Sequence, residues 1–169
     1  MLLERGLRAA TVADVAEAAG VAKGTMYLYF DSKDALIAAL RARYLDGFSQ
    51  AMTAAAGSSA TERLRRLVEG LFTFAARNHA LHHLLFHESG FSEEDAFTSV
   101  RVTLTGIISD GVAAGEMATA DPDIAASFIL HGVHGSMVEV LHHGTKGARV
   151  RRVPGRLADL AERAVAGAR

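Results

Sequence analysis

Apolar residues recur at helical spacing along most of the chain. The first clear case is Val12, Val15, Ala16 and Ala19, which lie at positions i, i+3, i+4 and i+7 and form one apolar stripe. Gly20 supplies the stop signal for this short helix. Similar patterns predict the remaining helices, giving an all-α chain of about nine helices and no strand. The other predicted helical ranges are 1–6 (the end of a helix), 21–30, 32–56, 61–78, 81–89, 92–115, 122–143 and 154–167.

Several of these ranges begin with residues that favour the start of a helix. Thr11 is a good N-cap, and Asp14 three residues later gives a weaker form of the capping box. Asp121 followed by Pro122 is an N-cap with proline at the first helical position, and Pro154 is expected to open the last helix in the same way.

Composition narrows the class of protein. Half of the 169 residues are apolar and there is no cysteine, so disulfides and thiolate metal sites are excluded. No apolar run reaches the roughly 18 residues of a membrane span, and the N-terminus lacks the basic-then-apolar order of a signal peptide. We therefore expect a cytoplasmic protein without membrane association.

Catalytic signatures are missing. The sequence has no nucleophile elbow, no phosphate-cradling glycine loop and no His-Glu-x-x-His motif. We expect neither enzymatic activity nor a cofactor.

The net charge of −1 is unevenly distributed. Residues 1–47 are balanced, residues 48–145 have a net charge of −6, and residues 146–169 have a net charge of +5. The N-terminal part therefore has no broad basic patch. If it binds DNA, affinity must come from a few well-placed cations, from helix N-termini and from two copies of the module.

Residues 21–30 combine the groups that suit a DNA backbone. They follow the 12–19 helix after the turn at Gly20, so the two short helices predict a helix-turn-helix. Several groups there suit phosphates or base edges, although surface solvation, capping or packing would also explain individual residues. The candidate DNA-binding residues are Thr11, Lys23, Gly24, Thr25, Tyr27, Leu28, Tyr29 and Lys33.

The sequence from Thr11 to Leu36 resembles the N-terminal module of the TetR/AcrR family of transcriptional regulators. The resemblance includes the turn glycine, the Lys-Gly-Thr opening, the Tyr-x-Tyr-Phe ending and the Ser-Lys start of the next helix. It implies a DNA-binding domain over residues 1–48 and a helical ligand-binding and dimerisation domain over 49–169. It further implies a homodimer that binds a pseudo-palindromic double-stranded operator and is released by a small-molecule inducer.

The resemblance also implies an incomplete first helix. Residues 2–6 correspond only to the end of the four-turn helix that covers the motif in the family. An alternative is therefore a TetR-like sensor dimer whose DNA binding is impaired by this truncation. A start codon further upstream, followed by a basic helical extension that leads into Met1, would decide against that alternative.

Aromatic and histidine side chains suggest where an inducer would bind. The expected pocket is largely apolar, with one or two polar anchors. Its candidate residues are Phe72, His83, Phe86, His87, Phe128, His131 and His134. The spacing of His79, His83 and His87 also permits a metal site, with Glu88 or Glu139 as a further ligand, but hydrogen-bonding or pocket-lining histidines are the preferred interpretation and no metal is expected.

The last two long helices are the candidate dimer interface. Small residues on the first would allow a partner helix to approach, and apolar residues on the second would supply contact, with intrachain packing as the alternative. The candidate interface residues are Gly132, Ser136, Val140, Leu157, Leu160 and Val165.

Overall fold

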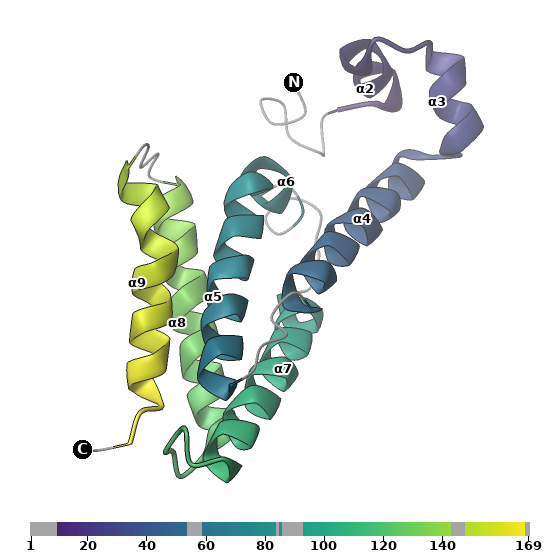
Figure 1. The fold of residues 1–169 in the computed structure, drawn as a ribbon. Coiled ribbons are helices and arrows are strands. Elements are labelled where there is room, and N and C mark those ends of the chain that lie inside the picture. Colours follow the sequence, from purple (N-terminus) through teal and green to yellow (C-terminus); the bar gives the residue numbers. More distant parts are fainter. Residues whose placement is uncertain (1–9, 54–58, 84, 86–92, 143–147, 168–169) are drawn as a thin grey trace. The chain divides into compact units, whose positions relative to one another are not determined.

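The computed structural model describes residues 10–53, 59–83, 85, 93–142 and 148–167, and every regular element in these residues is a helix (Figure 1). This confirms the all-α prediction. The helix expected over residues 1–6 lies outside the described residues. The helices are α2 (Val12–Ala19), α3 (Lys23–Tyr29), α4 (Lys33–Thr53), α5 (Ala60–Arg77), α6 (His79–His83), α7 (Glu93–Ala113), α8 (Pro122–His142) and α9 (Ala148–Ala164).

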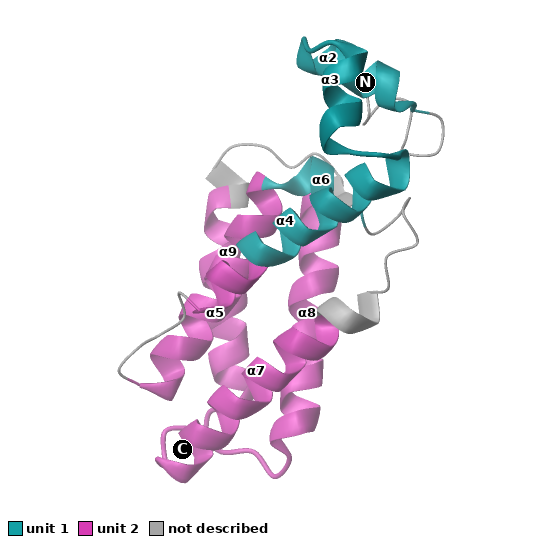
Figure 2. Ribbon diagram, turned by 90° about the vertical axis from the view of Figure 1, so that its right-hand side faces the viewer, with its two compact units in different colours: residues 1–47, 78–93 teal, residues 48–77, 94–169 magenta. Residues whose placement is uncertain are grey.

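The chain divides into two compact units (Figure 2). Unit 1 comprises Met1–Gly47 together with Asn78–Glu93, and unit 2 comprises Phe48–Arg77 together with Glu94–Arg169. The first division falls beside the boundary expected at residue 48. Unit 1, however, also takes up α6, which the sequence had placed with the C-terminal domain. Helix α4 begins in unit 1 and its last residues belong to unit 2.

Unit 1 is built on the packing of α2 against α3 and on the apolar stripe of α4. Val12 and Ala16 are buried, as their spacing predicts, and Leu36 is buried on α4. Two turns further along α4, Tyr44 is also buried, where it meets α6.

Unit 2 is a helical bundle in which α5 packs against α8 and α9, and α8 packs against α9. Helix α5 is strongly amphipathic, and the face predicted by its helical period is the face that is buried. Its polar side contributes Arg65, whose guanidinium Nε lies 2.7 Å from Glu162 Oε1 on α9. The largest side chains fully buried in this core are Phe72, Leu64, Leu67, Leu104, Ile108, Val68, Val100 and Val165.

Two helix boundaries differ from the sequence prediction. Helix α9 begins at Ala148, so Pro154 lies inside the helix and does not open it. An internal proline removes one helical hydrogen bond, at a cost of about 3 kcal/mol. Burial of Leu157, Ala158 and Ala161 against α5 and α8 offsets that cost. Helix α6 covers His79–His83, whereas a helix over 81–89 was expected; residues 86–89 lie outside the described part.

Helix α8 is more apolar than the sequence analysis allowed. Its segment Pro122–Leu141 has a mean hydropathy of 1.4 and by length and composition could cross a membrane, although only 28% of it is buried. A core helix of a bundle passes the same test, and α8 does pack within unit 2. Its low burial leaves apolar side chains on the surface.

Candidate functional site

The ends of α2 are fixed by local hydrogen bonds. Thr11 Oγ1 accepts a hydrogen bond from the Asp14 backbone N–H at 3.2 Å, and the Thr11 backbone N–H donates to Asp14 Oδ2 at 2.7 Å, which completes a capping box. At the other end Gly20 has φ 68°, in the left-handed region that glycine adopts without strain. The turn before α3 therefore has a defined direction.

Capping also limits what Thr11 offers to DNA. Its hydroxyl donates to Asp14 Oδ2 at 2.8 Å, and its backbone N–H donates to the same oxygen. The hydroxyl and the backbone N–H of Thr11 are thus both engaged within the chain. The structural role of Thr11 is to start α2.

Helix α3 presents most of its surface to solvent. None of its seven residues is buried, and Leu28 and Tyr29 are 83% and 77% exposed. A Cβ added at Gly24 would meet no atom within 4 Å, so the backbone there is open to close approach. An apolar side chain as exposed as Leu28 gains nothing from its own fold and is available to a partner.

Polar and charged groups accompany Leu28 on α3. Lys23 lies at the first position of the helix, with its Nζ 5.9 Å from the centroid of the Tyr27 ring. Thr25 lies one turn before Leu28 and is exposed. The hydroxyl-bearing residues Tyr27 and Tyr29, on either side of Leu28 in the sequence, are exposed as well. Together they provide a cation, three hydroxyls and one apolar tip on a short, exposed helix.

The connection from α3 to α4 is short, and a hydrogen bond stabilises each of its ends. The Phe30 N–H donates to the Met26 carbonyl at 2.9 Å and closes α3. Ser32 caps α4, because its Oγ accepts a hydrogen bond from the Ala35 N–H at 3.1 Å. Lys33 then opens α4, half-buried, which places a second cation close in sequence to α3.

Of the described candidates for an inducer pocket, Phe128 and His131 line one shallow depression on α8, whereas Phe72 lies apart from them in the core of unit 2. Phe72 is only 1% exposed and belongs to the core of unit 2, whereas Phe128 is 72% exposed on α8. His131 and His134 lie near the Phe97 ring of α7, with ring centroids 5.9 and 4.7 Å away. The side chain of His83 and residues Phe86 and His87 lie outside the described part of the chain.

His131 and His134 of α8 have partners within the chain. Nδ1 of His131 lies 2.7 Å from the Ser127 carbonyl oxygen, which can only accept, so the proton of this hydrogen bond is on Nδ1. Among the side chains that the structure describes, no group of three or more His, Asp or Glu residues is arranged to hold a metal ion.

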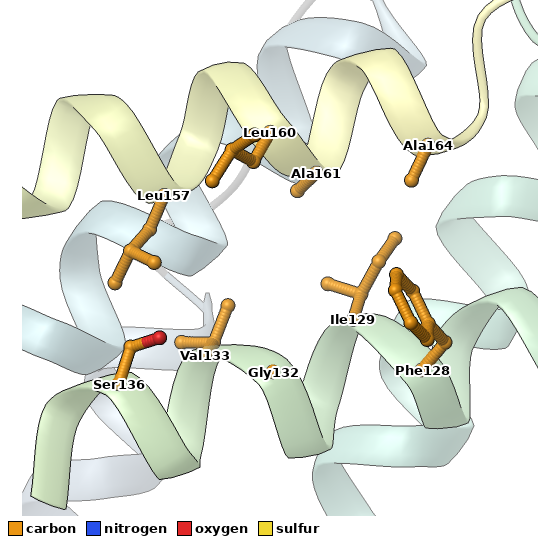
Figure 3. A pocket seen from close by; sticks show the side chains of 9 residues that line it. All are labelled: Phe128, Ile129, Gly132, Val133, Ser136, Leu157, Leu160, Ala161 and Ala164. Carbon is orange, nitrogen blue, oxygen red and sulfur yellow. The ribbon is translucent and has the colours of Figure 1, made fainter. Parts of the chain in front are cut away.

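An apolar groove runs between α8 and α9 (Figure 3). It has a volume of about 230 Å³, and Phe128 and Leu160, which are 72% and 61% exposed, take part in its lining. Ser136 contributes a hydroxyl at one end of an otherwise apolar lining. The lining residues are Phe128, Ile129, Gly132, Val133, Ser136, Leu157, Leu160, Ala161 and Ala164.

Four of the six candidate interface residues, Gly132, Ser136, Leu157 and Leu160, line this groove. Val140 is half-buried. Val165 is 1% exposed, so its side chain serves the core of unit 2 and does not reach the surface.

Phe128 is the aromatic part of this surface, although the sequence predicted it in an inducer pocket. Ile124, Phe128, Gly132 and Ser136 repeat every four residues and so share one stripe of α8. Ile124 is 68% exposed and lines the adjoining shallow depression with Phe128 and Gly132. The four-residue spacing was the available signal.

Tyr44 and His82 form a buried polar pair that was not predicted from the sequence. The hydroxyl of Tyr44 and Nδ1 of His82 form a hydrogen bond of 2.7 Å, and both residues are buried, at 3% and 6% exposure. Burial raises the pKa of Tyr44 well above its ordinary value, so the hydroxyl stays protonated. The helical spacing of His79, His83 and His87 is visible in the sequence, whereas no such spacing marks His82.

Two protein-family models match this chain, one near its N-terminus and one further along. A family model described as "Bacterial regulatory proteins, tetR family" matches residues 1–40, and one described as "Tetracyclin repressor-like, C-terminal domain" matches residues 57–138. The HTH-type transcriptional repressor KstR2 of Rhodococcus jostii is 28% identical over 138 residues, covering 76% of this chain and 67% of that protein. A second KstR2, from Mycobacterium tuberculosis, is matched over 41% of its own length.

Solved structures share the fold. The ketosteroid transcriptional regulator KstR2 of Mycobacterium tuberculosis superposes with a TM-score of 0.79 at 23% identity, over 99% of this chain and 90% of that one. The regulator FadR of Bacillus subtilis in complex with stearoyl-CoA gives a TM-score of 0.76 at 22% identity, over 97% and 93%. At these identities the likeness is one of fold.

Proposed function

The chain belongs to the TetR family of bacterial regulatory proteins and is a DNA-binding transcriptional regulator, and we propose that it is a repressor released from its operator by a small molecule. The observation that carries the proposal is the exposed helix α3, with Lys23, three hydroxyls and Leu28 on its surface. A regulator that acts on DNA in this way belongs in the cytoplasm.

DNA recognition in this proposal relies on phosphate contacts and on few base contacts. Lys23 and Lys33 would bind phosphates, with Tyr27 and Tyr29 donating hydroxyl hydrogen bonds beside them. Arg, Asn and Gln, which read base edges best, do not occur in α3, so Leu28 and Thr25 would read thymine methyl groups. Specificity then depends on two copies of α3 reading two half-sites of a pseudo-palindrome about one helical turn apart, or a small multiple of that.

The second copy of α3 is supplied by a homodimer through α8 and α9. The groove between these helices is apolar, and the exposed side chains of Ile124, Phe128 and Leu160 surround it. A two-fold axis brings the same face of each protomer together, so the exposed aromatic of one subunit can enter the groove of the other. The low burial of α8 supports this assignment, because its apolar residues lack sufficient cover within one chain.

The inducer in this proposal is a largely apolar molecule bound in unit 2. Relatives support this class: one neighbour is described as a ketosteroid regulator and another is in complex with stearoyl-CoA. A steroid-like or long-chain acyl compound therefore has priority in a ligand screen. Thermal unfolding with palmitoyl-CoA, a free fatty acid and a sterol ketone, each against an unrelated anionic detergent, would identify the class by a specific stabilisation.

Selection of operator DNA tests the proposal as a whole. We expect enrichment of a pseudo-palindrome, bound with an affinity that falls steeply with salt. Lys23→Ala should weaken binding and reduce the slope of log K against log salt by about 2 per dimer, because one phosphate contact is lost at each half-site. Arg151→Ala, an exposed cation of α9, is the matched control and should leave the slope unchanged. Enrichment of an unpaired site, or equal effects of both substitutions, would contradict the proposal.

A further inference from the structure

The exposed stripe of α8 changes from apolar to acidic along its length. Ile124 and Phe128, at its beginning, are 68% and 72% exposed, and Glu139, near its end, is exposed as well. These three residues occupy positions i, i+4 and i+15, which lie on one face of a helix. The surface assigned to the dimer therefore has an apolar end and a charged end on this helix.

The exposed stripe of α9 changes from basic to apolar. It consists of Arg152, Arg156, Leu160 and Ala164, which repeat every four residues and are all exposed. Leu160 and Ala164 line the groove, whereas the two arginines lie beyond it. Glu139, Arg152 and Arg156 form no ion pair with any side chain that the structure describes. Their charges are therefore available to a partner.

The two helices are antiparallel, which brings the acidic end of one stripe to the basic end of the other. Only residues 143–147 connect them, and Ser136 lies across the groove from Leu157 (Figure 3). Glu139 lies one turn beyond Ser136, and Arg156 directly precedes Leu157. One end of the combined face is thus apolar, and the other end carries charges of both signs.

This division of the face selects the direction of the two-fold axis. An axis parallel to α8 and α9 keeps every residue at its own level, so apolar ends meet and charged ends meet. An axis perpendicular to the helices would instead lay Glu139 on the apolar end of the partner's face. Covering a carboxylate with apolar side chains is costly unless a cation accompanies it, so the parallel axis is favoured.

The same axis decides which helices become neighbours. In a bundle of α8 and α9 from both subunits, the axis runs through the centre and places the two copies of α8 at opposite corners. Each α8 therefore lies beside α9 of the partner subunit. Glu139 then approaches the two arginines of that helix and not its own symmetry copy.

We propose that Glu139 pairs with Arg152 and Arg156 of the partner subunit, and that these symmetry-related pairs make the face selective for a second copy of this chain. This rests on the proposed homodimer through α8 and α9. The apolar end supplies most of the affinity, because exposed ion pairs contribute little net attraction. The charges exclude wrong partners, since a chain with a like charge at these positions meets repulsion there.

Two full-length variants with opposite charge changes test for pairing between subunits. Glu139→Arg leaves only cations at the three positions, and Arg152→Glu/Arg156→Glu leaves only carboxylates. In a homodimer of either variant like charges meet at both contacts, so its dissociation constant should rise by about tenfold or more. In the heterodimer opposite charges meet at both contacts. Pairing within one chain cannot produce this recovery, because mixing leaves the contacts inside each chain unchanged.

Native mass spectrometry of an equimolar mixture, with a tag on one chain, measures all three dimers. The squared heterodimer concentration divided by the product of the two homodimer concentrations is about 4 for random pairing, and should be about 100-fold higher for these variants. Co-expression of the two chains gives the same ratio if either variant alone fails to accumulate.

Arg151→Glu/Arg163→Glu is the matched control, because it changes the net charge equally at exposed positions of α9 outside the stripe. Arg163 lines a separate depression with Glu116 and Met117. Mixed with Glu139→Arg, this control should give the random ratio. A ratio as high as that of the charge variants would assign the effect to net charge and overturn the ion pair.

Random pairing of the two charge variants, with a dimeric wild type, would also overturn the ion pair and leave the homodimer standing. A wild-type protein that is monomeric at micromolar concentration would instead overturn the proposed homodimer, and the pairing with it. The two failures are therefore distinguishable.

Discussion

Substitution of Phe128 by Ala is expected to separate the proposed dimer into monomers. Phe128 is 72% exposed in one chain, on the stripe of α8 that lines the apolar groove. In a two-fold dimer each substitution acts twice, once on each subunit. The change should leave the fold of the monomer intact, because so little of the side chain is buried within its own chain.

The size of the effect follows from the exposed area. A Phe side chain presents about 200 Å², so about 140 Å² of Phe128 is open to solvent in a single chain. Covering that area is worth about 3.5 kcal/mol at about 25 cal/mol per Å². If only half of it is covered in the dimer and two copies are lost, the dimer is weakened by roughly 3.5 kcal/mol, or about 400-fold in dissociation constant.

Sedimentation equilibrium over a concentration series measures this directly. Val102→Ala is the matched control, since Val102 is 61% exposed on α7 but does not line the groove. We expect wild type and Val102→Ala to remain dimeric at micromolar concentration while Phe128→Ala dissociates. An unchanged dimer in Phe128→Ala, or equal weakening in both variants, would refute the assignment of this face.

Three further predictions concern single residues. Gly111→Ala should destabilise the protein by about 1–3 kcal/mol, because the new Cβ would lie 2.6 Å from Met117 Sδ. Gly106→Ala on the same helix meets open space and should stabilise the protein by about 0.5–1 kcal/mol. Thermal unfolding of the two variants in parallel would contradict this reasoning if both melting temperatures shifted in the same direction. Thr11→Ala removes the cap of α2 at a cost of about 1 kcal/mol, and hydrogen exchange should show about fivefold faster opening of α2; unchanged protection would contradict the capping argument. Replacing half-site thymines by deoxyuridine should weaken wild-type binding by about fourfold per contacted methyl group. The same replacement should weaken Leu28→Ala less, because only the contacts of Thr25 remain to be lost, and an equal loss in both would exclude the methyl contact of Leu28.

Local signals allowed much of unit 1 to be predicted from the sequence. The start of α2 depends on Thr11 and Asp14, three residues apart, and its end depends on the backbone freedom of Gly20 alone. The start of α8 is equally local, since Asp121 Oδ1 accepts hydrogen bonds from the backbone N–H groups of Asp123 and Ile124 at 3.0 Å. Such signals need no knowledge of the rest of the fold, which is why they could be found in one sequence.

Features that depend on distant partners could not be predicted in this way. The helical start of α9 before Pro154 is stabilised by tertiary packing, which overrides the local preference of proline. His82 owes its role to Tyr44, 38 residues away, and no spacing rule connects the two. The sequence spacing shows on which face of α8 Phe128 lies. It does not show whether that face is exposed or lines an internal cavity, because this depends on how the other helices pack against it.

The pairing of α5 with α9 bears on how the chain folds as it is made. The bond from Arg65 to Glu162 closes a loop of 97 residues, and α9 follows every other described helix. At about 5–20 residues per second of synthesis, the apolar face of α5 waits roughly 5–20 s for the helix that covers it. During that interval the nascent bundle must be shielded by α7 and α8 or by a chaperone, so slowing the ribosome between these helices should lower the yield of active regulator without altering its sequence.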